Sequence, residues 1–295
     1  MRSEQYVFAV DGGGSGCRVR LCDAAGHVCA EAVGGPANVF TDRQAALTNI
    51  LATIDRAAEI GGLRKSDIAA ATAHLGVAGV VGTKQSGLIS EAMPFADLTI
   101  SDDRHTSVVG AFGTDDGVLV AVGTGSFVAA KSADNLRYIG GWGHRLSDQA
   151  SGFWLGENIL RRTVLAVDGL AAHSDLTQRV LTQYGGTPAA LADFAQTAPP
   201  HDIAALAPLV IDAAGAGDTD GIALMQDGAA YLMACMRAAG WADETALCLT
   251  GGIGPAYADY LDATLRNAIV PARGSALDGA MQLALSRAAD RSPTS

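Results

Sequence analysis

The sequence predicts an α/β protein of two related domains, residues 1–113 and 114–295. Residues 7–10 form a continuous apolar run of the kind found in a strand buried on both faces. A glycine cluster follows, and residues 17–21 then alternate between apolar and polar side chains. The same order of apolar run, Gly/Thr/Ser turn and strand recurs over residues 118–130. Between the two hairpins, apolar strands alternate with helical segments, which is typical of α/β domains.

Strands and one amphipathic helix account for the first half. A third strand over residues 27–33 is expected to complete a three-stranded meander. The next helix is expected to start at Thr41, because Gln44 three residues later gives a capping-box pattern. Its apolar residues follow helical spacing, so one face should cover the sheet. The other expected elements are a strand near residues 70–77, a helix around 85–93, and a strand at 98–101 that ends in Asp102 and Asp103.

Helices dominate the second half of the chain. Residues 170–240 are rich in alanine and are expected to be mostly helical, with a break at Pro199 and Pro200. A helix is expected to begin at Pro255, because proline suits the first helical position. The other expected elements are helices over residues 153–167, 227–239 and 277–288, a strand over 246–250, and a frayed end at 292–295.

Composition limits the classes of partner. The net charge of −11 disfavours nucleic acid and anionic membranes. Five cysteines, an odd number with no C-x-x-C pair, suggest neither a disulfide framework nor a zinc site. No apolar run approaches the roughly 18 residues of a membrane span, and the first strand leaves no room for a signal peptide. The sequence therefore predicts a cytoplasmic protein in a reducing compartment.

The first glycine turn suits phosphate. A dinucleotide-binding G-x-G-x-x-G must open a helix and a P-loop must end in Gly-Lys-[Ser/Thr], whereas this turn opens a strand and no lysine follows. What remains is a hairpin whose exposed N–H groups suit anionic oxygens. Asp11 ends the first strand, where a carboxylate could hold hydrated Mg²⁺. An ordinary glycine-rich hairpin is the alternative.

Two further glycine turns repeat this logic. The turn at residues 123–126 gives the second half its own hairpin tip, so a nucleoside triphosphate could be held between two related domains. Chance similarity of two turns is the alternative. The third turn, residues 251–254, follows a buried strand and could bring backbone close to a flat ligand such as adenine.

Five sequence blocks occur in the order expected of one superfamily. The blocks are Asp11-Gly12-Gly13-Gly14-Ser15, Gly76-Val77-Ala78-Gly79, Asp103 after a strand, Gly123-Thr124-Gly125-Ser126 with Gly140-Gly141-Trp142-Gly143, and Gly251-Gly252-Ile253-Gly254. With these blocks the chain resembles the sugar-kinase, heat-shock-ATPase and actin superfamily, in its branch of bacterial N-acetylglucosamine kinases, glucosamine kinases and BadF/BadG-type ATPases. This resemblance implies two actin-like (ribonuclease H-like) domains with a nucleotide and sugar cleft between them, the second domain carrying a helical insertion.

The resemblance also implies ATP and Mg²⁺ as cofactors. Asp11 would hold Mg²⁺ through water, and the amides of Gly13, Gly14 and Ser15 would contact phosphates. Arg18 is close enough in sequence to approach a phosphate, although solvent exposure is the alternative. The full set of expected nucleotide-binding residues is Asp11, Gly12, Gly13, Gly14, Ser15, Arg18, Thr124, Gly125, Gly251, Gly252 and Ile253.

Asp103 is the expected catalytic base. In the family the catalytic aspartate ends a strand and a Gly-Ala pair follows seven and eight residues later, so Gly110 and Ala111 indicate Asp103 rather than Asp102. A positioned carboxylate can accept the proton of the attacking sugar hydroxyl. The remaining catalysis of phosphoryl transfer is positioning and charge neutralisation. The alternative for the acidic pair is a solvated helix N-cap.

The second sugar block departs from the family pattern. Relatives that act on N-acetylglucosamine carry Gly-Asp-Glu-Gly-Ser where this chain has residues 147–151, and asparagine where it has Phe127. Because this run more closely resembles bacterial glucosamine kinases, the expected activity is ATP-dependent phosphorylation of D-glucosamine at its 6-hydroxyl. The alternatives are an N-acetylglucosamine kinase and a BadF-type activator ATPase, and a homodimer is left open. The expected substrate-binding residues are Asn38, Asp103, Thr124, Gly141 and Asp148.

Overall fold

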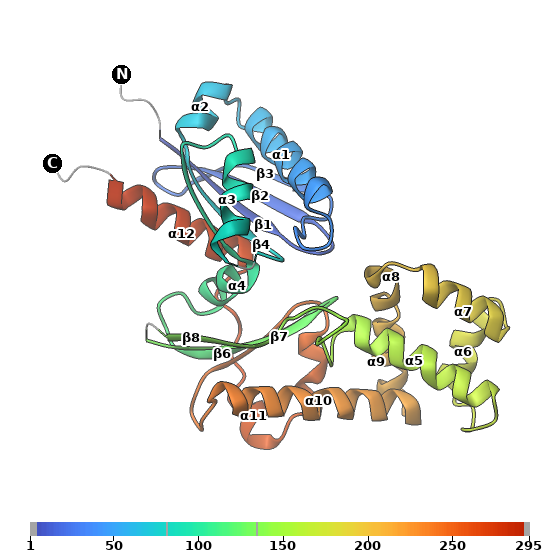
Figure 1. The fold of residues 1–295 in the computed structure, drawn as a ribbon. Coiled ribbons are helices and arrows are strands. Elements are labelled where there is room, and N and C mark those ends of the chain that lie inside the picture. The colour runs from blue at the N-terminus through green and yellow to red at the C-terminus, as the bar shows by residue number, and fades with distance from the viewer. Residues whose placement is uncertain (1–4, 81, 134, 292–295) are drawn as a thin grey trace. The chain divides into compact units, whose positions relative to one another are not determined.

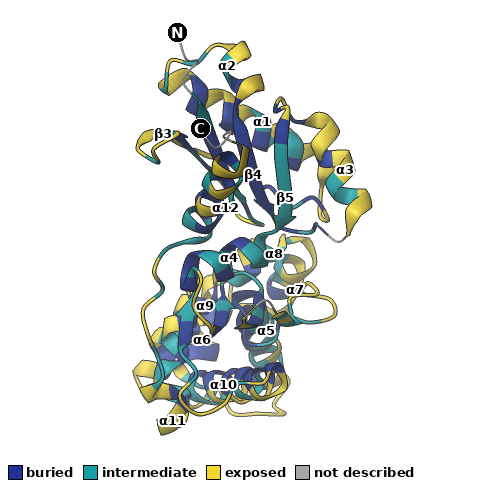
Figure 2. Ribbon diagram, turned by 90° about the vertical axis from the view of Figure 1, so that its left-hand side faces the viewer, coloured by how far each residue is buried: buried dark blue, intermediate teal, exposed yellow. Residues whose placement is uncertain are grey.

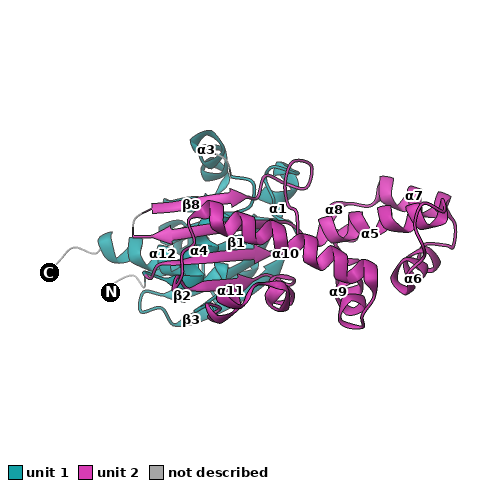
Figure 3. Ribbon diagram, turned by 90° about the horizontal axis from the view of Figure 1, so that it is seen from below, with its two compact units in different colours: residues 1–114, 272–295 teal, residues 115–271 magenta. Residues whose placement is uncertain are grey.

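The computed structural model describes residues 5–80, 82–133 and 135–291. The chain divides into two compact units, shown in different colours in Figure 3: unit 1 is residues 1–114 and 272–295, and unit 2 is residues 115–271. The expected boundary after residue 113 agrees with this division to within one residue. The assignment of the C-terminal segment to the second domain is wrong, because the segment packs in unit 1.

Unit 1 is built on a five-stranded sheet (Figure 1). The antiparallel pairing of the first three strands confirms the predicted meander, and the fourth and fifth strands continue the sheet parallel to the first. The strand order is β3 (Val28–Gly34), β2 (Cys17–Asp23), β1 (Tyr6–Gly12), β4 (Thr72–Val77) and β5 (Asp97–Asp102).

Helices cover both faces of this sheet. Phe8 and Val10 of β1 pack in one core with α1 (Arg43–Ile60), and Val7 and Ala9 pack in another with α12 (Ala276–Arg291). β4 is buried along its whole length (Figure 2). The apolar run that predicts β1 is therefore explained by burial on both sides.

Two features of the helices of unit 1 differ from the sequence prediction. The N-cap of α1 is Asp42 rather than Thr41, since the Asp42 carboxylate accepts a hydrogen bond from Ala45 N at 2.9 Å. The short helix α2 (Lys65–Ala70) was not expected. The predicted helix near residues 85–93 is α3 (Thr83–Ala92), and α4 (Asp103–Phe112) follows β5 directly.

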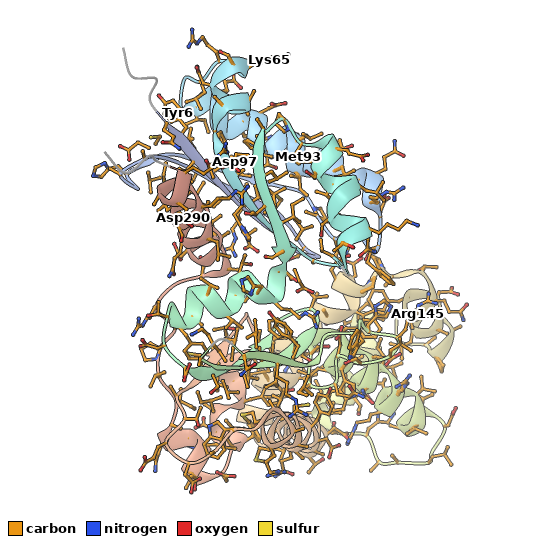
Figure 4. The ribbon with its side chains drawn as sticks, turned by 60° about the vertical axis from the view of Figure 1, so that its left-hand side comes forward. Tyr6, Lys65, Met93, Asp97, Arg145 and Asp290 are labelled. Carbon is orange, nitrogen blue, oxygen red and sulfur yellow. The ribbon has the colours of Figure 1, made fainter. Side chains whose placement is uncertain are left out.

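The C-terminal helix holds the start of β5 and packs on α4, the helix that follows this strand. At the start of β5, the buried Asp97 accepts a hydrogen bond from Arg287 Nε at 2.6 Å and pairs with Arg291 Nη1 at 2.9 Å; Figure 4 shows Asp97 on β5 and Asp290 on α12. Near its own end, α4 packs closely on the residue before α12, because a Cβ on Gly110 would lie 2.0 Å from the Ser275 carbonyl oxygen. The Gly-Ala spacing that indicates Asp103 thus has a packing cause.

Unit 2 repeats the topology of the first four strands of unit 1. Its sheet has two antiparallel pairs and one parallel pair, so β6 and β9 correspond to β1 and β4. The internal repeat predicted from the glycine turns is confirmed at the level of strand order. That order is β8 (Asn135–Gly140), β7 (Ser126–Ser132), β6 (Gly117–Val122) and β9 (Leu247–Thr250). The edge strand β8, none of whose residues is fully buried, was not expected.

The helices of unit 2 pack on one face of its sheet around Val118, Val120 and Val122. The segment expected to be an α-helix from Pro255 is instead the 3₁₀ helix η1 (Gly254–Tyr260), and the break at Pro199 and Pro200 is confirmed. The helices are α5 (Gly152–Val167), α6 (Asp175–Gln183), α7 (Pro188–Thr197), α8 (Pro200–Ala204), α9 (Ala207–Gly215), α10 (Thr219–Ala239) and α11 (Ala263–Asn267).

No helix within the described ranges combines the length and the apolar character that a membrane span requires. The predicted fraying of residues 292–295 lies outside the described residues.

Candidate active site

The first glycine turn of unit 1 presents free amide groups. Its base is closed by a hydrogen bond from Gly13 N to Gly16 O at 2.8 Å, and neighbouring segments donate to the carbonyls of Gly12 and Gly13. The Gly13 N–H is used inside the turn, and the predicted contact of this amide with phosphate remains a prediction. Within the described residues, no protein acceptor meets the N–H groups of Gly14 and Ser15. A Cβ on Gly14 would have no neighbour within 4 Å, so a ligand can approach the backbone closely.

Asp11 and Arg18 face each other across the β1–β2 pair. Arg18 donates to Asp11 Oδ2 from Nη2 at 2.5 Å and from Nε at 3.2 Å. The Asp11 side chain is 12% exposed, whereas that of Arg18 is 52% exposed and can move into solvent. Arg18 therefore lies beside the turn, and in this structure it pairs with Asp11, the carboxylate predicted to hold Mg²⁺.

Asp102, Asp103 and Arg104 lie where β5 ends and α4 begins. Asp102 caps α4, because its carboxylate accepts a hydrogen bond from the backbone N of Arg104 at 2.8 Å. The Arg104 guanidinium donates two further hydrogen bonds to the same carboxylate, from Nε to Oδ1 at 2.9 Å and from Nη2 to Oδ2 at 2.7 Å. Both side chains are largely buried, at 20% and 17% exposure. The N-cap role considered for this acidic pair thus belongs to Asp102, which leaves Asp103 available for chemistry.

The carboxyl group of Asp103 holds its proton unusually tightly. Burial raises its pKa to about 8, and the negative charge of Asp102, a hydrogen bond with the Asp102 side chain and the charge of Asp11 act in the same direction. Arg104 opposes these effects. Asp11 on β1 is thus one of the charges that act on Asp103, the first residue of α4, and the roles of both as site residues remain predictions.

The loop that carries Asn38 adjoins the same turn. Ala37 N donates to Gly13 O at 2.9 Å, and Asn38 Oδ1 accepts from Phe40 N at 2.9 Å and Thr41 N at 3.2 Å. The amide oxygen of Asn38 is therefore used to shape its own loop. The predicted contact of Asn38 with a sugar would fall to its Nδ2 group, and it remains a prediction.

The second glycine turn, in unit 2, lies against the start of α5. Gly152 N donates to Gly123 O at 2.8 Å and Phe153 N donates to Thr124 O at 3.2 Å. In the described part of the chain, the N–H groups of Thr124 and Gly125 meet no protein acceptor. This turn therefore resembles the one in unit 1 in having two free amides at its tip.

Asp148 lies directly over the second turn. A Cβ on Gly125 would be 2.8 Å from Asp148 Oδ2, so a larger residue there would displace this carboxylate. Asp148 is 7% exposed with a φ of 67°, and burial raises its pKa despite backbone hydrogen bonds from Ser126 and Gly143. Gly141, by contrast, is exposed in the loop that leads to Asp148, and its contact with a sugar remains a prediction.

The third glycine turn packs against the end of β6, the strand that leads into the second turn. Gly251 has a φ of 80°, and a Cβ there would lie 2.2 Å from Val122 O. Ile253 N donates to the same carbonyl at 3.0 Å, and the Ile253 side chain is buried in the core. Gly252 has open space around its Cα. Of the three residues expected near adenine, Gly252 offers open backbone, whereas Ile253 could take part only through its main chain.

Sequence reasoning missed two groups at these sites. Arg104 grips Asp102, and the only signal for it is an arginine two residues after an aspartate at a helix start. Gln149 has an amide oxygen, Oε1, that is buried without a hydrogen-bond partner, as is Asp148 Oδ1. Nothing in the pattern of residues 147–151 could have shown this, because it depends on how the loop folds.

Each turn by itself has donors that fit phosphate oxygens, and unit 1 adds a carboxylate that fits a hydrated metal ion. Backbone N–H groups at both turns suit phosphate oxygens, and a carboxylate suits a cation that keeps most of its waters. Across the described residues, no group of three or more His, Cys, Asp or Glu side chains could hold a metal by itself. Asp11 would therefore share Mg²⁺ with water and phosphate oxygens.

Duplicated sheets of this topology, each with a glycine turn after its first strand, define an actin-like α/β protein of the kind found in sugar kinases. The chain belongs to the BadF/BadG/BcrA/BcrD ATPase family, whose model matches residues 9–275, and membership of this family implies the use of ATP.

Individual relatives agree with this assignment. The chain is 29% identical to glucosamine kinase GspK of Vibrio cholerae serotype O1, over 95% of both chains. A Chromobacterium violaceum structure, provisionally described as an N-acetylglucosamine kinase, is 36% identical with a TM-score of 0.89, and the match covers 95% of this chain and 99% of that one. A ROK family glucokinase from Streptomyces griseus has the same fold, with a TM-score of 0.60 at 16% identity over 95% and 99% of the two chains.

Proposed function

We propose that this protein is an ATP-dependent amino-sugar kinase that transfers the γ-phosphoryl group to the 6-hydroxyl of D-glucosamine. The observation that carries the proposal is the similarity to a glucosamine kinase along 95% of both chains. The arrangement of Asp103, Asp11 and the first glycine turn within unit 1 supports it.

Asp103 would act as the general base. Its carboxylate accepts the hydroxyl proton while the sugar oxygen bonds to the γ-phosphorus and the bond from that phosphorus to the ADP oxygen breaks. The free N–H groups of Gly14 and Ser15, and those of Thr124 and Gly125, donate to phosphate oxygens. Arg18 turns from Asp11 to a phosphate. Mg²⁺, held by Asp11 and water, supplies neutralisation of phosphate charge when bound.

The free amine is the proposed 2-substituent. Asp148 Oδ1 and Gln149 Oε1, on consecutive residues, are acceptors that are each buried without a donor. A buried acceptor without a partner is costly, and an ammonium group brings three donors, whereas an acetamide brings one donor and a carbonyl that needs a donor of its own. N-acetylglucosamine is the second candidate, favoured by the 36% identity to the Chromobacterium protein.

A BadF-type activator ATPase fits less well. Such proteins use cysteines to bind an iron–sulfur cluster at a dimer interface. Of the five cysteines here, Cys29 alone is exposed and the other four are buried, with burial raising the pKa of Cys17 to about 12 and that of Cys22 to about 11. Buried, protonated thiols are poor cluster ligands.

A coupled ADP-release assay over a panel of hexoses and amino sugars tests the proposal. We expect turnover with D-glucosamine and none above background with Asp103→Asn. ADP release that is independent of every sugar would contradict a kinase and favour an activator ATPase.

A further inference from the structure

The loop from Asp148 to Ser151 in unit 2 has an unusual backbone. Asp148 and Ala150 have positive φ values of 67° and 68°, a conformation that residues with a Cβ rarely adopt. Both residues are buried, and the alanine has no polar side chain that could stabilise this conformation locally. Backbone strain of this kind persists only where the surrounding structure enforces it. The loop therefore depends on contacts that hold it from outside.

Two hydroxyl groups from outside the loop hold its carbonyl groups. The Tyr257 hydroxyl donates to Ala150 O at 2.7 Å. The Ser126 hydroxyl donates to Gln149 O at 2.6 Å. Tyr257 thus holds a strained residue of the loop directly, and Ser126 holds the residue before it.

Tyr257 is well supported for this task. It lies on the 3₁₀ helix η1 and is fully buried in the core of unit 2. A Cβ on Gly228 of α10 would collide with the Tyr257 ring and hydroxyl oxygen, so a larger residue there would displace them. The close packing of α10 thus sets where the hydroxyl can lie.

The loop held in this way carries the two acceptors proposed to bind the sugar amine. Asp148 Oδ1 and Gln149 Oε1 are each buried without a hydrogen-bond partner. A loop that was free to move would turn such acceptors toward water or an N–H group, because a buried acceptor without a partner is costly. Contacts that hold the loop from outside therefore keep both acceptors available to a ligand with several donors.

We propose that Tyr257 is a positioning residue of the sugar site, with Ser126 as a second support: by holding the carbonyl groups of Ala150 and Gln149, the two hydroxyls keep Asp148 Oδ1 and Gln149 Oε1 in place for the amine of the sugar. Neither hydroxyl is assigned a contact with the sugar. The inference rests on the proposed function, in which these two acceptors select the free amine. Acceptors that are fixed before binding favour the ligand that fits them, so a looser loop should discriminate less between amino sugars.

Two substitutions remove the two supports. Tyr257→Phe removes the hydroxyl and keeps the ring, so the space beside Gly228 stays filled. Ser126→Ala removes the second hydroxyl. Tyr260→Phe is the matched control, because Tyr260 lies on the same 3₁₀ helix and, in the part of the chain that the structure describes, its hydroxyl has no hydrogen bond to the loop.

The first test is backbone hydrogen exchange of the free protein, measured by mass spectrometry on peptides that cover residues 147–152. Exchange of these peptides should be about tenfold faster in Tyr257→Phe than in the wild type, as expected when a segment loses one hydrogen bond that holds it. Tyr260→Phe should exchange like the wild type. Equal exchange in Tyr257→Phe and the wild type would overturn the proposal. If Tyr257→Phe does not fold, Ser126→Ala takes its place, and unchanged exchange there would overturn the proposal.

The second test is the ratio of kcat/KM for D-glucosamine to kcat/KM for N-acetyl-D-glucosamine at saturating Mg·ATP. In Tyr257→Phe this ratio should fall about tenfold through a higher KM for D-glucosamine. KM for Mg·ATP should not change, because the third glycine turn is held separately by the hydrogen bond from Ile253 N to Val122 O at 3.0 Å.

A merely structural role of Tyr257 would lower kcat for both sugars alike and leave the ratio unchanged, and that result would overturn the proposal. If the wild type phosphorylates no sugar, the proposed function fails. Hydrogen exchange then still decides whether Tyr257 holds the loop.

Discussion

Replacing Asp103 by Asn should inactivate the protein and make it more stable. Loss of a general base typically costs about 10²–10⁴ in rate. The stability gain follows from proton linkage. Burial first, and then the charge of Asp102, raise the pKa of Asp103 to about 8 in the folded state, against an ordinary value of 3.8. The folded state therefore binds this proton while the unfolded state has released it.

The stability advantage of Asp103→Asn over the wild type should grow as the pH rises. A carboxyl group with a raised pKa contributes stability that is fully present below about pH 4 and is lost progressively up to pH 8. Each pH unit in this window is worth about 1.4 kcal/mol for one proton, so roughly 3 kcal/mol is lost between pH 5 and pH 7. The Asn variant has no such group. Its advantage in Tm over the wild type should therefore grow by about 4–5 °C between these two pH values, given the unfolding entropy expected for 295 residues.

Thermal unfolding at pH 5, 6 and 7, at fixed salt and protein concentration, measures this difference. All other titrating groups are common to both proteins and cancel. Asp67→Asn is the control, because the pKa of Asp67 is lowered to about 2 by its bond to Arg64, so this group is deprotonated in both states over the whole range. A Tm difference between Asp103→Asn and wild type that is constant with pH would refute the reasoning.

Three further substitutions separate binding from stability. Arg18→Gln should raise KM for Mg·ATP with little change in Tm, because the Arg18 side chain is 52% exposed, and an unchanged KM would remove Arg18 from the phosphate site. Gly14→Ala should also raise KM for ATP at unchanged Tm, because the added Cβ would meet no protein atom within 4 Å but would fill the open side of the turn. Gly87→Ala is the control: the added Cβ on α3 is equally uncrowded, and KM for ATP should not change. Asp97→Asn should lower the free energy of unfolding by about 1–3 kcal/mol, measured by urea denaturation, because two arginines lose their buried partner, and should spare kcat.

Local patterns predicted much of the fold. The run at residues 7–10, the glycine turn and the alternating strand that follows are decided by near neighbours in sequence, and β1 and β2 form where expected. The repeat of this pattern in the second half predicted the shared topology of the two sheets. Asp103 was selected because, in the family that the chain resembles, a Gly-Ala pair follows the catalytic aspartate, and Gly110 is a glycine because α4 packs closely there on Ser275.

Long-range contacts were beyond sequence reasoning. The helix α12 follows unit 2 in the chain but packs on β1 and β4 of unit 1, and an amphipathic pattern does not say which sheet it will cover. The use of the Gly13 amide inside the turn depends on the exact turn geometry. The grip of Arg104 on Asp102 depends on a rotamer that α4 and its neighbours select.

The most direct test of the central claim is the ratio of kcat/KM for D-glucosamine to kcat/KM for N-acetyl-D-glucosamine, measured with Mg·ATP. NMR of the phosphorylated product then identifies the oxygen that carries the phosphate. We predict a ratio above one and a phosphate on the oxygen of C6. A ratio below one would make the protein an N-acetylglucosamine kinase, and no phosphorylated sugar from either compound would contradict the proposed kinase.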